Sequence, residues 1–158
     1  MFKKLMAQPI WFKRILNLWP PYLGAGIRLE TLADDFSTAE VSLTLKKTNI
    51  NYVGTHFGGS LYSMTDPFYM LLLMNRLGKD YIMWDKSAEI EFKRPGKGKV
   101  TAIFHVTDEM VADIKEKTKN GEKYFPVYTV DVIDEQGKVV ASVKKTLYAK
   151  LKDRALEK

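Results

Sequence analysis

The sequence of 158 residues contains no cysteine and only two histidines. The missing thiols exclude a disulfide framework, a thiolate zinc site, an iron–sulfur cluster and a cysteine nucleophile. With so few soft ligands we expect no metal centre. What remains is a chain with 46% hydrophobic and 28% charged residues. That composition can hold a core without covalent cross-links and is too apolar for a disordered protein.

Long hydrophobic runs are also missing. The longest aliphatic and aromatic run is Phe68–Met74, far short of the roughly 20 residues that a membrane-spanning helix needs. Near the N-terminus, Gln8-Pro9 and Lys13-Arg14 interrupt the apolar stretch that a secretory signal would require. We therefore expect a cytoplasmic protein.

The sequence has little acidic charge relative to basic charge, with 25 Lys+Arg against 19 Asp+Glu and a net charge of +6. The excess lies at the two ends. Residues 1–26 and residues 144–158 each carry +4, whereas residues 27–143 carry −2. A nucleic-acid-binding domain usually carries a basic patch on its folded body, so nucleic acid is not an expected partner.

Residues 1–26 predict an amphipathic helix followed by a turn, with the helix over residues 10–19 and Pro20-Pro21 ending it. Two adjacent apolar stripes run along the helix: Trp11, Ile15 and Leu18, and Phe12, Leu16 and Trp19. The favoured interpretation is that this face packs on the domain or on a second subunit. Trp and Phe opposite Lys and Arg are also typical of a membrane-surface helix, but ten residues are few for stable docking.

Period-two alternation predicts six strands, over residues 27–33, 38–47, 81–93, 98–107, 123–133 and 138–151. A buried helix from Gly58 to Leu77 follows the second strand, and Pro67 should kink or break it. The third and fourth strands look like a pair around a Pro-Gly turn. The last two strands predict a hairpin, and a short helix over residues 108–119 precedes them.

A helix that is apolar nearly all round must be covered on several sides. One antiparallel sheet wrapped around one long central helix does this, which predicts an α+β hotdog fold over residues 27–152. Residues 1–26 add an N-terminal helix, and residues 153–158 form a charged tail. Because the sheet covers only one side of the helix, we expect a homodimer to cover the other.

The segment from Asn51 to Asp66 is the most informative for function. Gly58 and Gly59 stand where a loop leads into the buried helix, so the free N–H groups of its first turn point at whatever binds there. This arrangement suits an oxyanion. A tight, closely packed turn is the competing explanation for the two glycines.

Asp66 lies two turns into that otherwise apolar helix, on the face of Tyr62 and Tyr69. A carboxylate in such surroundings is costly unless it is paired or hydrogen-bonded. One interpretation makes Asp66 the cap of a helix that restarts at Pro67. The other makes it a general base or a nucleophile.

The Gly58-Gly59 pair followed by Asp66 resembles the His-Gly-Gly and helix aspartate of the phenylacetate-degradation type of hotdog thioesterase, and Asn51 and Gly54 match its asparagine and glycine. More closely, the whole chain resembles an uncharacterised hotdog-like family that neighbours these thioesterases. The stretches that carry this second resemblance are residues 17–27, 54–62, 66–69, 84–86 and 145–148.

The resemblance implies an acyl-CoA thioesterase that needs no cofactor, with CoA as part of the substrate. It also implies a homodimer, or a dimer of dimers, with two sites at the subunit interface. The amide at Gly58 and Gly59 would hold the thioester oxygen. Asp66 of the opposite subunit would activate water or attack, and Asn51 would position water or substrate. The substrate-binding candidates are Thr55, His56, Phe57, Tyr62, Tyr69, Lys93, Arg94 and Lys97.

One position departs from the family pattern. The thioesterases carry His before Gly-Gly, where this chain has Phe57, with His56 one residue earlier. Neighbouring side chains usually point apart, so His56 does not simply replace the missing histidine. The change favours an alternative, a non-catalytic acyl- or lipid-binding hotdog protein. A third hypothesis, a hydratase, generally requires a well-placed histidine beside a carboxylate.

Two charged groups remain to be explained. Lys93, Arg94, Lys97 and Lys99 crowd one turn. A solvated turn explains them most simply, and binding of the CoA phosphates is the functional interpretation. Asp85-Lys86 is interpreted as a local ion pair or a subunit contact.

Overall fold

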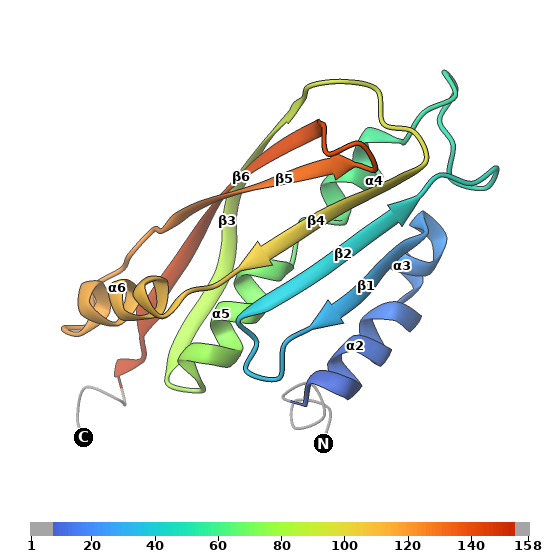
Figure 1. Cartoon of the computed structure of the whole chain (residues 1–158). Helices are drawn as coiled ribbons and strands as arrows, with labels where there is room; N and C mark the ends of the chain where they lie inside the picture. The colour runs from blue at the N-terminus through green and yellow to red at the C-terminus, as the bar shows by residue number, and fades with distance from the viewer. Residues whose placement is uncertain (1–7, 154–158) are drawn as a thin grey trace.

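The computed structural model describes residues 8–153 (Figure 1). The helices of this part of the chain are α2 (Pro9–Leu18), α3 (Pro20–Ala25), α4 (Gly58–Ser63), α5 (Phe68–Leu77) and α6 (Asp108–Thr118). Its strands are β1 (Ile27–Leu32), β2 (Thr38–Thr44), β3 (Tyr81–Phe92), β4 (Lys99–His105), β5 (Val127–Asp134) and β6 (Val139–Leu151). Lys3, Lys4 and residues 154–158 of the expected charged tail lie outside the described residues.

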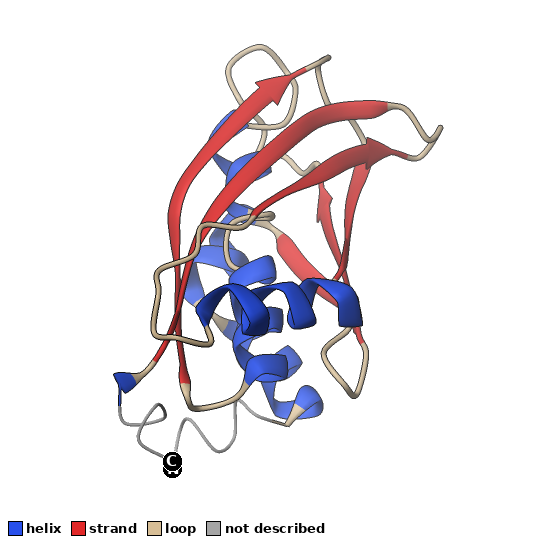
Figure 2. Ribbon diagram, turned by 90° about the vertical axis from the view of Figure 1, so that its left-hand side faces the viewer, coloured by secondary structure: helices blue, strands red, loops and turns tan. Residues whose placement is uncertain are grey.

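All six strands form one antiparallel sheet in the order β1-β2-β4-β5-β6-β3. The hairpin between β5 and β6 forms as predicted. Gly137 in its turn has a φ of +74°, and the Asp134 carboxylate accepts from the backbone amides of Gln136 and Lys138. The curved sheet and the helices against it (Figure 2) match the mixed helix and sheet predicted from the sequence.

The expected pair of the third and fourth strands is wrong. Among residues 8–153, β3 pairs with β6 alone, whereas β4 lies between β2 and β5. The backbone amides of Lys93 and Arg94 donate to the Val140 carbonyl. This contact turns the chain across the start of β6 before it reaches β4 (Figure 1). Alternation of apolar residues indicates a strand but carries no information on which strand pairs with it.

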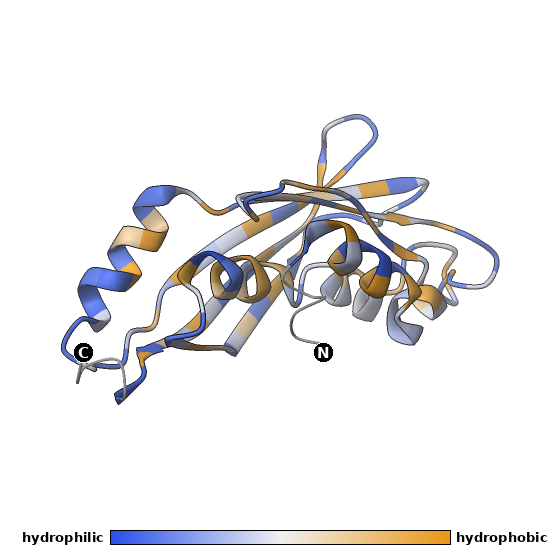
Figure 3. Ribbon diagram, turned by 90° about the horizontal axis from the view of Figure 1, so that it is seen from below, coloured by the Kyte–Doolittle hydropathy of each residue, from blue (hydrophilic) through white to orange (hydrophobic). Residues whose placement is uncertain are grey.

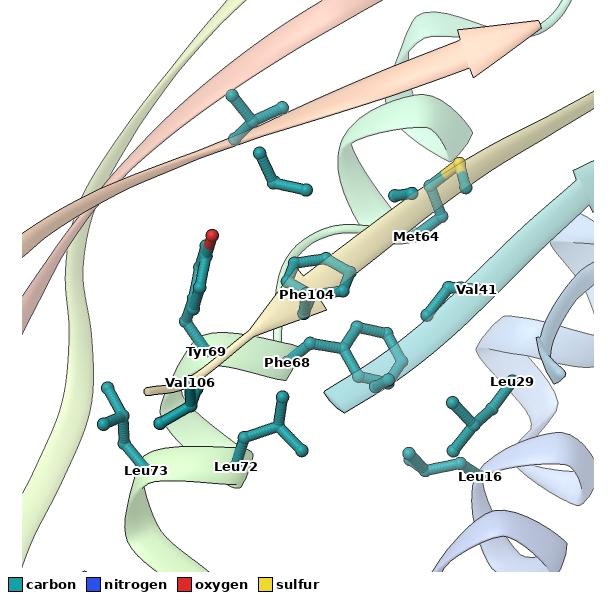
Figure 4. Packing of buried hydrophobic residues seen from close by; sticks show 14 of the residues in the cluster. Leu16, Leu29, Val41, Met64, Phe68, Tyr69, Leu72, Leu73, Phe104 and Val106 are labelled. Atoms are coloured by element: carbon teal, nitrogen blue, oxygen red, sulfur yellow. The ribbon is translucent and has the colours of Figure 1, made fainter. Parts of the chain in front are cut away.

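The central helix is split at Pro67. α4 ends at Ser63, and α5 begins at Phe68 and ends before Gly78, which has a φ of +83°. Proline removes the N–H that a continuous helix would need here. α5 buries Phe68 and Leu72 completely, and the Phe68 ring lies 5.0 Å from the ring of Phe104 on β4 (Figure 4). These contacts form the centre of the core.

The turn expected after the N-terminal helix is wrong, because Pro20–Ala25 form the helix α3, for which proline suits the first helical positions. The preceding helix α2 packs part of one of its two apolar stripes on the domain, whereas Trp19 of that stripe is exposed. Phe12 and Leu16 are buried, and the Phe12 ring meets Phe36 edge-on at 5.5 Å. Trp11 and Leu18, on the other stripe, are exposed. Within residues 8–153, no helix is both long and apolar enough to cross a membrane.

The short helix α6 lies at one end of the sheet, and its polar and apolar residues are visible in Figure 3. Val111 and Ile114 are buried, whereas Lys115 and Lys117 are exposed. The Thr107 hydroxyl caps the helix by accepting from the Met110 amide at 3.3 Å.

Candidate active site

Asp66 lies in the link between α4 and α5, and side chains hold it in place. The Tyr62 hydroxyl, one helical turn earlier, donates to Asp66 Oδ1 at 2.8 Å. The Lys145 ammonium, which comes from β6, donates to the same oxygen at 2.8 Å. α5 is capped by Pro67 with no side-chain hydrogen bond, so the interpretation of Asp66 as a helix cap is wrong.

Lys145 joins two carboxylates. Its side chain is 0% exposed, and its Nζ also lies 2.9 Å from Asp85 Oδ1. Burial lowers the pKa of Lys145, but the hydrogen bonds and charges of Asp66 and Asp85 outweigh burial and raise the pKa above its ordinary value. Burial also raises the pKa of Asp85, with Lys145 opposing the change. A buried ammonium is tolerated because it is paired in this way.

The sequence interpretation missed Lys145 as a site residue. A signal was present, because the buried positions of β6 alternate along the strand: Ala141, Val143, Lys145, Leu147 and Ala149. A lysine in that buried register calls for a nearby carboxylate. The expected ion pair of Asp85 with Lys86 is also corrected. Asp85 pairs with Lys145, and the Lys86 ammonium lies over the Phe125 ring at 3.8 Å.

The Gly58 and Gly59 amides begin α4 without hydrogen-bond partners among the described residues. The first amides that bond within this turn are those of Ser60 and Leu61, which donate to the Phe57 carbonyl. Aromatic rings pack on both glycines. A Cβ atom would meet the Phe92 ring at 2.9 Å on Gly58 and the Phe57 ring at 2.4 Å on Gly59. The absence of a side chain lets both rings lie close to the start of α4, while the two N–H groups are free to donate.

The loop before α4 is organised by Asn51. Its Nδ2 donates to the Thr55 hydroxyl at 2.9 Å and to the His56 carbonyl at 3.0 Å, and its Oδ1 accepts from the Thr55 amide. The buried His56 contacts the Gly98 carbonyl through Nε2 at 3.0 Å. Burial lowers the pKa of His56. These two side chains hold the loop in place, and Phe57 points outward with 58% exposure.

A cleft of about 410 Å³ brings several predicted site residues together. Its lining includes Asn51, Thr55, His56, Gly58, Lys93 and Arg94. Lys97 is not among its lining residues. The basic turn after β3 thus lies beside the start of α4, as the CoA-phosphate interpretation requires. Asp66 is not part of this lining.

Tyr69 is not brought to Asp66. Its hydroxyl donates to the Thr129 carbonyl at 2.9 Å, its ring packs edge-on against Phe104, and burial raises its pKa. The prediction that Tyr62, Asp66 and Tyr69 share one helix face holds only for a continuous helix. The break at residues 64–67 separates them, and only Tyr62 reaches the carboxylate.

The sequence matches one known protein family over most of its length. Residues 10–149 match the domain of unknown function DUF4442. The chain belongs to the DUF4442 family. No curated protein matches this sequence.

Solved structures share the fold of this DUF4442 chain at low sequence identity. A Pseudomonas aeruginosa protein of unknown function, described as a probable thioesterase, has a TM-score of 0.78 at 18% identity, over 88% of this chain and 93% of its own. A Haemophilus influenzae thioesterase has a TM-score of 0.66 at 15% identity, over 91% of both chains. The Escherichia coli PaaI protein of the phenylacetic acid degradation operon has a TM-score of 0.61 at 18% identity, over 87% of this chain and 91% of its own.

These likenesses establish the fold. The DUF4442 chain has the mixed helix and antiparallel sheet fold of thioesterase-like proteins that include PaaI, as the resemblance in its sequence predicted.

Proposed function

We propose that this DUF4442 protein hydrolyses acyl thioesters, with acyl-CoA as the substrate class. The observation that carries the proposal is Asp66. Its side chain is 44% exposed and is held on one oxygen by Tyr62 and the buried Lys145. A carboxylate fixed in this way and open to solvent can take a proton from water. The shared fold with thioesterase-like proteins supports this chemistry.

The proposed reaction needs no cofactor. A water molecule gives a proton to Asp66, and its oxygen adds to the thioester carbonyl carbon. The free amides of Gly58 and Gly59 hold the oxygen that becomes negative. When the carbon–sulfur bond breaks, its electron pair leaves with sulfur and Asp66 returns the proton to the thiolate. The products are a carboxylic acid and a thiol.

The basic turn after β3 is proposed to bind the carrier. Lys93 and Arg94 line the cleft beside Gly58, and Lys97 follows in the same turn. Basic side chains suit the phosphates of CoA. Lys93 also lies near Glu91, with its Nζ 2.5 Å from the carboxylate. A phosphate would therefore replace that surface contact.

The complete site is proposed to form between two copies of the chain. In one copy, Asp66 does not line the cleft beside Gly58. The outer edge of β3 has no strand partner in the part of the chain that the structure describes, and Ser87, Ala88 and Glu89 are exposed. An open edge is a ready surface for a second strand. Asp66 of one subunit would then face the Gly58 and Gly59 amides of the other.

The test is thiol release from a panel of acyl-CoA chains by the wild-type protein and by Asp66→Asn. The substitution keeps the size of the side chain but removes its ability to take a proton. We expect the rate to fall by about 10²–10⁴-fold, the usual contribution of a general base. A matched control is Asp131→Asn, which makes the same change at an exposed position of β5 and should leave the rate within twofold.

Equal thiol release by Asp66→Asn and the wild type would show that the mechanism is wrong. If the wild type releases no thiol from any chain but binds acyl-CoA tightly, the alternative function, acyl binding without turnover, replaces hydrolysis. The exposed Phe57 ring on Gly59 is the observation that favours this alternative. The hydratase hypothesis lacks its histidine, because the His56 ring is buried against Gly98.

A further inference from the structure

We propose that Lys145 is the positioning residue of Asp66, that Asp85 is the permanent counter-ion of Lys145, and that Asp66 therefore reacts through Oδ2. The inference deepens the proposed function, because it assigns a role to a buried ion cluster around the carboxylate that the hydrolysis uses. The titration of Lys145 tests this role without any substrate.

The two oxygens of Asp66 have different surroundings. Oδ1 accepts from both the Tyr62 hydroxyl and the Lys145 ammonium, each at 2.8 Å. Oδ2 has no hydrogen-bond partner among residues 8–153, although the side chain is 44% exposed. The two donors fix the orientation of the carboxylate and leave Oδ2 free. A water molecule or a thioester therefore meets Oδ2.

The charge of the cluster explains why Asp85 is present. Whether Asp66 takes a proton from water or forms an acyl ester, it loses its negative charge during the reaction. Lys145 is 0% exposed, so at that moment its ammonium would be buried without compensation, which is costly. Asp85 Oδ1, at 2.9 Å from Nζ, supplies a negative charge throughout the cycle. Asp66 can then change its charge while Lys145 stays protonated.

Few other groups can set the charge of Lys145. The Tyr62 ring from α4 lies 5.4 Å from Nζ. Across the sheet, Lys145 faces Tyr128 on β5 and Ala88 on β3. Burial raises the pKa of Tyr62 and of Tyr128, so both phenols are neutral at physiological pH. The described charges in contact with Lys145 are therefore Asp66 and Asp85.

The experiment measures the titration of Lys145 and the pH dependence of thiol release in the same full-length proteins. In wild type, the Lys145 13Cε resonance, assigned by its loss in Lys145→Arg, which keeps the charge, should not titrate below the ordinary lysine range of about pH 10. In Asp85→Asn its midpoint should fall by about 1–3 pH units, because an opposite charge in contact has been removed. The alkaline limb of kcat should move to lower pH by the same amount. A residue that serves only the fold would not move this limb.

Two further variants test whether Lys145 positions Asp66 for the reaction. Lys145→Met should lower kcat about 100-fold, the scale of a displaced reacting group, with a smaller change in KM. The matched control Lys144→Met changes the neighbouring exposed lysine of β6 and should leave kcat within twofold. If Lys145→Met does not fold, Asp85→Asn still decides, because it keeps the pair of Lys145 with Asp66.

An unchanged Lys145 midpoint in Asp85→Asn would overturn the proposal, and so would a midpoint that falls while the alkaline limb of kcat stays in place. The outcome for hydrolysis is separate. If wild type releases no thiol from any acyl-CoA, the proposed function fails. The NMR titration then still accepts or rejects Asp85 as the counter-ion of Lys145.

Discussion

At the scale of the residue, His56 gives a prediction about pH and stability. Burial lowers the pKa of His56. Histidine in the unfolded chain binds a proton below its ordinary pKa of about 6.5, whereas His56 in the folded protein binds one only at lower pH. Its contribution to the free energy of unfolding is complete above about pH 6.5 and is lost as the pH falls. One such group contributes a slope of at most about 1.4 kcal/mol per pH unit.

We expect His56→Gln to flatten this loss of stability between pH 7 and pH 5, as measured by urea denaturation across that range. Glutamine keeps a side-chain donor for the Gly98 carbonyl but does not titrate. The control is His105→Gln at the exposed end of β4, which should keep the wild-type slope. If both variants keep it, the burial of His56 does not govern the acid side of the stability curve.

The residues of the site differ in how far the sequence predicts them. Asp66 could be proposed as a site residue because a charge inside an apolar helix is costly without a partner. Gly58 and Gly59 could be proposed because the pair stands where a loop leads into a helix. The partner itself was not predicted. Lys145 is 79 positions away from Asp66, and the contact depends on how β6 lies against the link between α4 and α5.

At the scale of the element, Asn17 joins α2 to the edge of the sheet. Its Nδ2 donates to the Leu29 carbonyl at 3.0 Å, and its Oδ1 accepts from the Leu29 amide at 2.8 Å. This side chain satisfies backbone groups that an edge strand otherwise leaves open. The amphipathic pattern of α2 predicts a packed face, but it does not predict that one amide replaces a strand partner.

We expect Asn17→Ala to lower the free energy of unfolding by about 1–3 kcal/mol, because Leu29 is buried and its amide would be left without a partner. Urea denaturation measures this change. Asn120→Ala, at an exposed turn, should stay within about 0.5 kcal/mol of wild type. Similar stability of both variants would mean that α2 does not secure β1 through Asn17.

At the scale of the whole molecule, the open edge of β3 predicts a homodimer. Ser87 is exposed near Glu89 and Glu91 on this edge and faces Thr146, not Lys145, across the sheet, so Ser87→Glu adds like charge where two strands would meet. Sedimentation velocity should show twice the mass of one chain for wild type and one chain for the variant. Thiol release should fall with the loss of the dimer, because the proposed site needs both copies.

The control is Ala112→Glu, which adds a glutamate at an exposed position of α6 and should remain dimeric and active. A wild-type protein that hydrolyses thioesters as a single chain would contradict the shared site. It would leave the chemistry of Asp66 to be explained within one subunit.

The sequence by itself determined the six strands, the N-terminal helix, the break at Pro67 and the helix over residues 108–119, because alternation, helical spacing and proline act between residues that are close along the chain. It did not predict α3, where a turn was expected. It also singled out Asp66 as a candidate through the cost of a charge in apolar surroundings, and the paired glycines through their place between a loop and a helix. Only the tertiary structure decided that β3 pairs with β6, that Tyr69 packs into the core, and that Lys145 lies between Asp66 and Asp85. These contacts join distant segments, and their energies depend on burial and geometry that no local pattern encodes.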